Sequence, residues 1–155
     1  LKGRMVRSGS TSVEYRPLTS NPLDLAAAIV ARCAGPARYV AVADAILTRQ
    51  DDWVGLGFNF VNRELRRFAD EKPIDQIRII AQSIGLNEIA KAQGLSDAAI
   101  KQCFADPNIV NPVLKTGDAA AQIIKATPSF YIAGRDTGVH DWPTLEPIIR
   151  AQGAK

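Results

Sequence analysis

The sequence predicts an α/β fold in which a long helical block is inserted beside a small sheet. Two observations indicate this class. Runs of β-forming residues lie near both ends of the chain, at 11–16 (TSVEYR) and 129–133 (SFYIA). Between these runs, apolar residues recur at helical spacing. Because strands tend to share one sheet, we expect the two runs to be neighbouring strands with the helical block alongside.

The first helix is predicted to begin at Asn21. Asparagine is a good N-cap, and Pro22 suits the first helical position, where no backbone N–H is needed. Leu25, Ile29 and Cys33 then follow at intervals of four residues, which places them on one stripe of the helix. The pattern therefore predicts that Cys33 faces the interior.

The middle of the chain, 51–126, is predicted to be helical throughout. Ser96 is the expected cap of a short helix that carries Cys103 on its apolar face. Pro107 is expected to end that helix, and a further helix is expected at 118–125.

The end of the chain changes character after this block. Residues 129–133 form an apolar run typical of a strand covered on both faces. Residues 134–138 are rich in turn formers, and 139–141 could return as the second strand of a hairpin. Pro143 is expected to open the last helix.

Composition and charge exclude several classes of protein. A chain of 155 residues is long enough to bury a core, and no apolar run approaches the length that spans a bilayer. The net charge is only +3, and the densest basic patch (Arg63, Arg66 and Arg67) has acidic neighbours. We interpret that patch as a solvated helix face rather than a nucleic-acid interface. Two cysteines and one histidine are too few for a zinc site, and the sequence predicts no metal or cofactor.

The only two thiols, Cys33 and Cys103, are too far apart in sequence to form a redox Cys-X-X-Cys pair. Both lie on helix faces that are predicted to point inward, which argues against attack on a substrate. A free cysteine is often simply a small buried residue. A structural bridge between the two and inert burial therefore both remain open.

Other side chains are also functional candidates. Histidine is a common general base, which makes His140 a candidate, but no nucleophile motif accompanies it, so we expect an exposed hairpin histidine. Trp53, Phe58 and Phe60 form an aromatic cluster for which core packing is the expectation and substrate contact the alternative.

Three segments, taken together and in order, resemble one family. These are VEYR-P with LDLAA at 13–17 and 23–27, Ala-Arg-Cys at 31–33 followed by Gln50 and Trp53, and Thr-Pro-Ser-Phe at 127–130 followed by Gly134. They are similar to the second core strand, the start of the helical insertion and the Thr-cis-Pro loop of DsbA-type oxidoreductases, which have a thioredoxin fold. Cys103, in a Cys-Phe-Ala-Asp context, also resembles a cysteine of some members.

The resemblance implies a single thioredoxin-fold domain over 1–155 with a helical insertion at about 36–117. It implies a cis bond between Thr127 and Pro128 and a Thr127 backbone that pairs with an extended substrate. The implied activity is thiol-disulfide exchange on extended or unfolded proteins, with a redox partner protein and a periplasmic or secreted location. Such a location would favour a disulfide between Cys33 and Cys103.

The sequence departs from the family in one respect. In the family, a strand and a Cys-X-X-Cys at a helix N-terminus precede the strand expected here at 11–16, and 1–8 resembles only the tail of that helix. The chain as given therefore carries no catalytic cysteine of that kind, and we expect an upstream segment to supply it. The alternatives are a non-catalytic peptide-binding protein of the same fold and a glutathione-dependent enzyme of the kappa type.

Overall fold

A computed structural model describes residues 5–153 of the chain. Backbone contacts divide it into two compact units. The helical unit is Arg16–Gln122, and the terminal unit combines the part up to Tyr15 with the part from Ile123 onward. The helical unit is therefore wider than the insertion expected at about 36–117, because the first helix packs with the helices that follow it.

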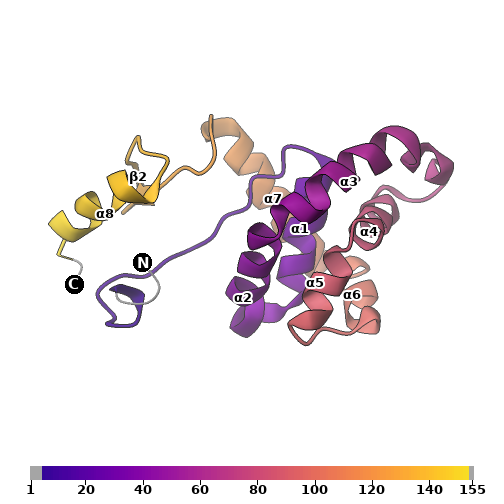
Figure 1. Cartoon of the computed structure of the whole chain (residues 1–155), viewed down its shortest axis with the longest axis horizontal. Helices are drawn as coiled ribbons and strands as arrows, with labels where there is room; N and C mark the ends of the chain where they lie inside the picture. The colour runs from indigo at the N-terminus through magenta and orange to yellow at the C-terminus, as the bar shows by residue number, and fades with distance from the viewer. Residues whose placement is uncertain (1–4, 154–155) are drawn as a thin grey trace. The chain divides into compact units, whose positions relative to one another are not determined.

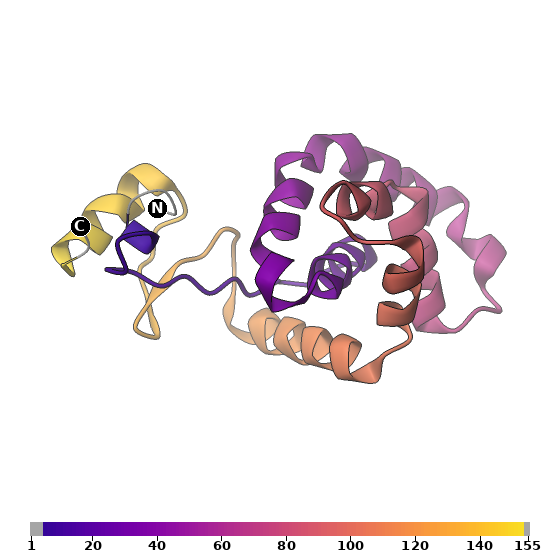
Figure 2. The same ribbon diagram turned by 90° about the horizontal axis from the view of Figure 1, so that it is seen from below.

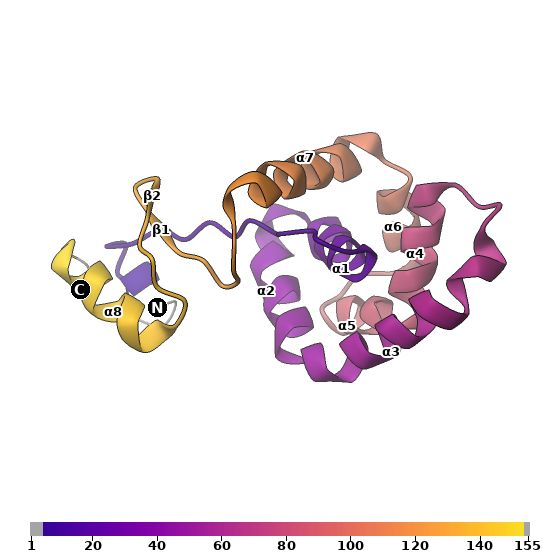
Figure 3. The same cartoon turned by 90° about the horizontal axis from the view of Figure 1, so that it is seen from above.

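Helix α1 (Pro22–Cys33) is the centre of the helical unit. Its N-terminus forms as the sequence predicts: Asn21 Oδ1 accepts hydrogen bonds from the backbone N–H groups of Leu23 and Asp24, and Pro22 opens the helix. Ile29 and Val30 are fully buried. Figure 3 shows α1 in the middle of this unit, where it contacts the next five α-helices of the chain.

The remaining helices of this unit follow α1 in the chain (Figure 1). They are α2 (Gly35–Thr48), α3 (Gln50–Arg63), the 3₁₀ helix η2 (Leu65–Phe68), α4 (Pro73–Ser83), α5 (Leu86–Ala92), α6 (Asp97–Phe104) and α7 (Pro107–Ile123). The predicted helical character of the middle of the chain is confirmed. So is the cap of α6, where Ser96 Oγ accepts from the Ala99 N–H.

The prediction for the last of these helices was wrong in its extent. The sequence suggested a break at Pro107 and a new helix at 118–125, but α7 is continuous from Pro107 and contains Pro112. Pro107 occupies the first position of α7, where its missing N–H costs nothing, and Asp106 Oδ1 accepts from the Asn108 N–H. Figure 2 shows α7, in orange, along one side of the helical unit.

The terminal unit contains a hairpin and a helix. Strand β1 (Tyr131–Ile132) pairs antiparallel with β2 (Arg135–Asp136). Ala133 and Gly134 between them have φ angles of +49° and +78°, which is the combination of a type I′ turn. Helix α8 (Trp142–Ala151) follows and is capped by Asp141.

Two strand predictions for this unit were therefore wrong. The return strand forms at Arg135–Asp136 rather than at 139–141, because the two-residue turn at 133–134 reverses the chain earlier than expected. Residues 11–16 are not a strand, because the described sheet contains only β1 and β2 and gives this segment no ladder partner. The expected pairing of 11–16 with 129–133 is likewise not present. Of the segment 1–8, expected to be the tail of a helix, residues 1–4 lie outside the described part.

A substitution at Gly117 tests the packing of α7. A Cβ there would overlap Thr19 Oγ1 and lie 3.0 Å from Thr19 Cβ. We expect Gly117→Ala to destabilise the helical unit by about 1–2 kcal/mol, because overpacking outweighs the gain in helix propensity. Gly55→Ala in α3 is the control, since a Cβ there meets nothing within 4 Å, and it should stabilise by up to about 1 kcal/mol. Chemical denaturation measures the free energy of unfolding of both variants. An equal change in that free energy for the two variants would contradict the packing at Gly117.

Candidate functional site

The site centres on an exposed loop between α7 and β1, here called the cis-Pro loop (residues 126–129). The peptide bond between Thr127 and Pro128 is cis, in agreement with the sequence prediction. Ala126, Thr127 and Pro128 are exposed to solvent, and Ser129 is partly buried.

Hydrogen bonds from within the terminal unit hold alternate carbonyl groups of this segment. Ser129 Oγ donates to the Ala126 carbonyl at 2.6 Å. The Pro128 carbonyl oxygen lies 2.6 Å from His140 Nδ1. The Phe130 carbonyl accepts from the Thr137 N–H at 3.0 Å and from Thr137 Oγ1 at 2.8 Å.

The intervening residues keep their backbone groups available. Thr127 and Ser129 have no hydrogen bond to their backbone N–H or C=O groups from residues 5–153. The bond from Thr137 to Phe130 extends the ladder of the hairpin, in which hydrogen bonds recur at alternate residues. The peptide groups of Tyr131 therefore point to the edge of β1 that faces away from β2. We call this the open edge of β1.

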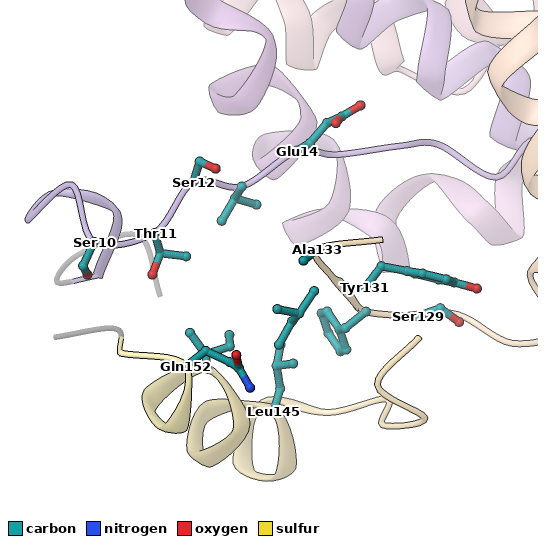
Figure 4. Close-up of a pocket in the computed structure, with 13 residues that line it drawn as sticks. Ser10, Thr11, Ser12, Glu14, Ser129, Tyr131, Ala133, Leu145 and Gln152 are labelled. Atoms are coloured by element: carbon teal, nitrogen blue, oxygen red, sulfur yellow. The ribbon is translucent and has the colours of Figure 1, made fainter. Parts of the chain in front are cut away.

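A pocket of about 360 Å³ lies beside the same segment (Figure 4). It is lined by residues 10–14, residues 129–133, Leu145, Ile149 and Gln152. The two runs that the sequence predicted as sheet neighbours thus border one pocket instead of pairing. Glu14 is exposed, and its carboxylate points away from the pocket in Figure 4.

Cys33 and Cys103 form a disulfide between α1 and α6, with their Cα atoms 5.6 Å apart. The sequence left a bridge and inert thiols open, and the bridge is what forms. Cys103 is only 5% exposed, and there is no free cysteine in the described chain. Cys103 belongs to the apolar core of the helical unit, and Cys33 packs against that core.

His140 is exposed, as the sequence predicts, but it also contacts the loop through Pro128. That contact could not be read from the sequence, because it joins residues that only the fold brings together. Its neighbour Asp141 accepts hydrogen bonds from the backbone N–H and the hydroxyl of Thr144. These bonds, with a smaller contribution from His140, hold the pKa of Asp141 below its usual value.

The predicted aromatic core is only partly correct. Trp53 is buried, and its Nε1–H donates to the Ile46 carbonyl at 3.0 Å. Phe60 stacks on Phe68 with ring centroids 6.3 Å apart. Phe58, however, is 51% exposed, because α3 turns it to the side opposite the buried Gly57 and Trp53.

Other kinds of site find little support in the described residues. Arg63, Arg66 and Arg67 are exposed, and Arg67 forms an ion pair with Glu64. Within 5–153 no group of three or more histidine, cysteine, aspartate or glutamate side chains is placed to hold a metal ion. No helix in the same range has both the length and the apolar character needed to cross a membrane.

Comparison with known proteins identifies the family. The sequence profile described as thioredoxin matches residues 1–151 of this chain. The chain belongs to the thioredoxin family. A crystal structure of a protein-disulfide isomerase from Novosphingobium aromaticivorans has a similar fold, with a TM-score of 0.68 and 24% sequence identity. That match covers 85% of this chain and 69% of the other chain, so the fold is thioredoxin-like with a helical insertion.

A curated protein with a functional name is also similar to this chain. A Rickettsia conorii protein named as a protein-disulfide oxidoreductase is 24% identical over 152 residues. The alignment covers 96% of this chain but only 47% of the relative, so the thioredoxin-family chain described here spans about half of that protein's length.

The disulfide should be a structural crosslink of the helical unit. Thiol titration of the unfolded, non-reduced protein should find no free thiol, and reduction should release both. Because the crosslinked residues are 70 apart in sequence, replacing both with alanine should lower the free energy of unfolding by about 4 kcal/mol in the chain-entropy model. Added reductant should lower the stability of the wild type and leave the double variant unchanged. Two titratable thiols in the non-reduced protein would contradict the bridge.

Proposed function

We propose that this chain is the substrate-binding part of a DsbA-like thiol-disulfide oxidoreductase that acts on extended or unfolded proteins. The observation that carries the proposal is the exposed cis-Pro loop, in which Thr127 and Ser129 keep their backbone groups available beside the open edge of β1. Such an edge can pair with an extended peptide as an added strand, with main-chain hydrogen bonds giving the affinity. Membership of the thioredoxin family and the name of the Rickettsia conorii relative support the same activity.

Thiol-disulfide exchange requires a thiolate that attacks a disulfide sulfur, forms a mixed disulfide and releases the other sulfur as a thiolate. A second thiolate then resolves the mixed disulfide. Cys33 and Cys103 are already joined to each other, and Cys103 is buried. We therefore assign the exchange to cysteines other than these two, in a part of the protein outside the 155 residues of this chain.

The location is proposed to be periplasmic or secreted. A disulfide in the core of the helical unit supports this, because structural disulfides form and persist mainly in oxidising compartments. A redox partner protein would then restore the catalytic cysteines after each turnover.

The chain alone should not turn over a substrate. Incubated with a dithiol peptide in a glutathione buffer, it should not raise the rate of disulfide formation above the buffer alone. The product of the complete gene should raise that rate, and so should its double variant with alanine at Cys33 and Cys103. Peptide disulfide formation followed by mass spectrometry measures all three.

The outcomes separate the proposal from its alternatives. Turnover by the chain alone, or loss of chemistry in the correctly folded double variant, would contradict the assignment of the exchange to other cysteines. Peptide binding without turnover by the complete product would indicate a non-catalytic binding protein. Conjugation of glutathione to an electrophile would indicate an enzyme of the kappa type.

A further inference from the structure

The side chain of His140 makes a polar contact with the cis-Pro loop. This contact is not one of the hydrogen bonds that pair β1 with β2. The Nδ1 atom of His140 lies 2.6 Å from the carbonyl oxygen of Pro128, twelve residues earlier in the chain. A carbonyl oxygen can only accept, so Nδ1 must carry the hydrogen. This holds both for the neutral ring with its proton on Nδ1 and for the imidazolium, and the contact therefore exists in either charge state.

The backbone at His140 is fixed by the start of α8. Asp141, the next residue, accepts from the Thr144 N–H at 2.9 Å and from the Thr144 hydroxyl at 2.8 Å, which closes the first turn of that helix. One turn on, Leu145 is only 2% exposed and anchors α8 in the core of the terminal unit. The backbone from which the His140 side chain extends to the loop is therefore fixed in position.

The contact decides which backbone groups of the loop remain available. Pro128 has no N–H, and its carbonyl is held by His140. The carbonyl of Ala126 accepts a hydrogen bond from Ser129 Oγ, and the carbonyl of Phe130 accepts one from Thr137 Oγ1. Without His140, the Pro128 carbonyl would accept hydrogen bonds from water instead, and its peptide plane could rotate. That rotation would also turn the N–H of Ser129, which belongs to the same peptide plane.

We propose that His140 is a positioning residue for peptide binding: by holding the Pro128 carbonyl, it directs the adjoining N–H of Ser129 toward an extended peptide. The ligand class is an unfolded polypeptide segment that binds through its main chain. This inference rests on the proposed function, but it concerns one side chain to which neither the family match nor the sequence gives a role in peptide binding.

His140 is not a core residue, which makes the role testable. Its side chain is exposed, and the cap of α8 is supplied by Asp141 instead. His140→Leu removes the donor. His140→Asn returns an amide N–H close to the position of Nδ1 and should restore the contact. Arg150→Leu is the matched control, because it breaks an α8 ion pair with Glu146 without touching the loop.

The experiment measures binding of fluorescein-labelled, reduced and carboxamidomethylated insulin B chain to the full 155-residue chain by fluorescence anisotropy. We expect His140→Leu to weaken binding about tenfold, because a loop that is no longer held in its binding conformation must be ordered when the peptide binds. His140→Asn should stay within about threefold of the wild type, and Arg150→Leu should bind as the wild type does. Rescue by asparagine is the outcome that a general loss of structure would not give.

Each contrary result has a separate meaning. If the wild-type chain does not bind the probe, peptide binding by this chain fails and the proposed function fails with it. If the wild type binds and His140→Leu binds equally well, only the role of His140 is overturned. Should His140→Leu not fold, ¹⁵N spectra of the wild-type imidazole decide instead. A proton on Nδ1 that is protected from exchange is expected, and a ring with its only proton on Nε2 would overturn the inference.

Discussion

The helical unit depends on the burial of one helix on nearly all sides. Ala26, Ile29 and Val30 of α1 have no exposed surface, and the helix contacts five others. Burying a valine or isoleucine side chain stabilises a fold by roughly 1.5–3 kcal/mol. The disulfide between Cys33 and Cys103 adds a covalent link between the C-terminal end of this helix and α6. The helices around α1 are consequently held by a common apolar surface rather than by their individual propensities.

The terminal unit is held differently. The contiguous apolar core of the helical unit contains neither Met5 nor Leu145, although each is only 2% exposed. Both buried side chains lie in the terminal unit. In the same unit, the cis-Pro loop is shaped by polar contacts from Ser129, Thr137 and His140, all of which act on backbone carbonyls. Polar contacts of this kind add little net stability in solvent but fix direction, which is the property a peptide-binding edge needs.

Local signals in the sequence predicted the helices well and the sheet poorly. Asn21-Pro22 and Ser96 act within one turn of the chain, so their caps could be recognised from neighbours in sequence. The strand expected at 11–16 failed because a strand exists only through its partner, and β-propensity does not supply one. Ala133 hid the hairpin turn, because alanine rarely adopts a positive φ and gave no turn signal. At the site, the family resemblance predicted the cis bond at Thr127–Pro128, whereas the contact of His140 depends on where α8 begins.

The two kinds of stabilisation place different demands on the sequence. A buried aliphatic core tolerates exchange among residues of similar volume, so the helical unit can diverge while keeping its fold. The loop has less freedom, because each of its contacts requires a donor at a particular place: a hydroxyl at Ser129 and Thr137 and a ring N–H at His140. An apolar residue at Ser129 or His140 leaves the Ala126 or the Pro128 carbonyl without its side-chain partner, whereas an apolar residue at Thr137 removes only one of the two hydrogen bonds to the Phe130 carbonyl. Selection for peptide binding should therefore act on these polar side chains more strongly than on the apolar residues of α1, even though the latter contribute far more to stability.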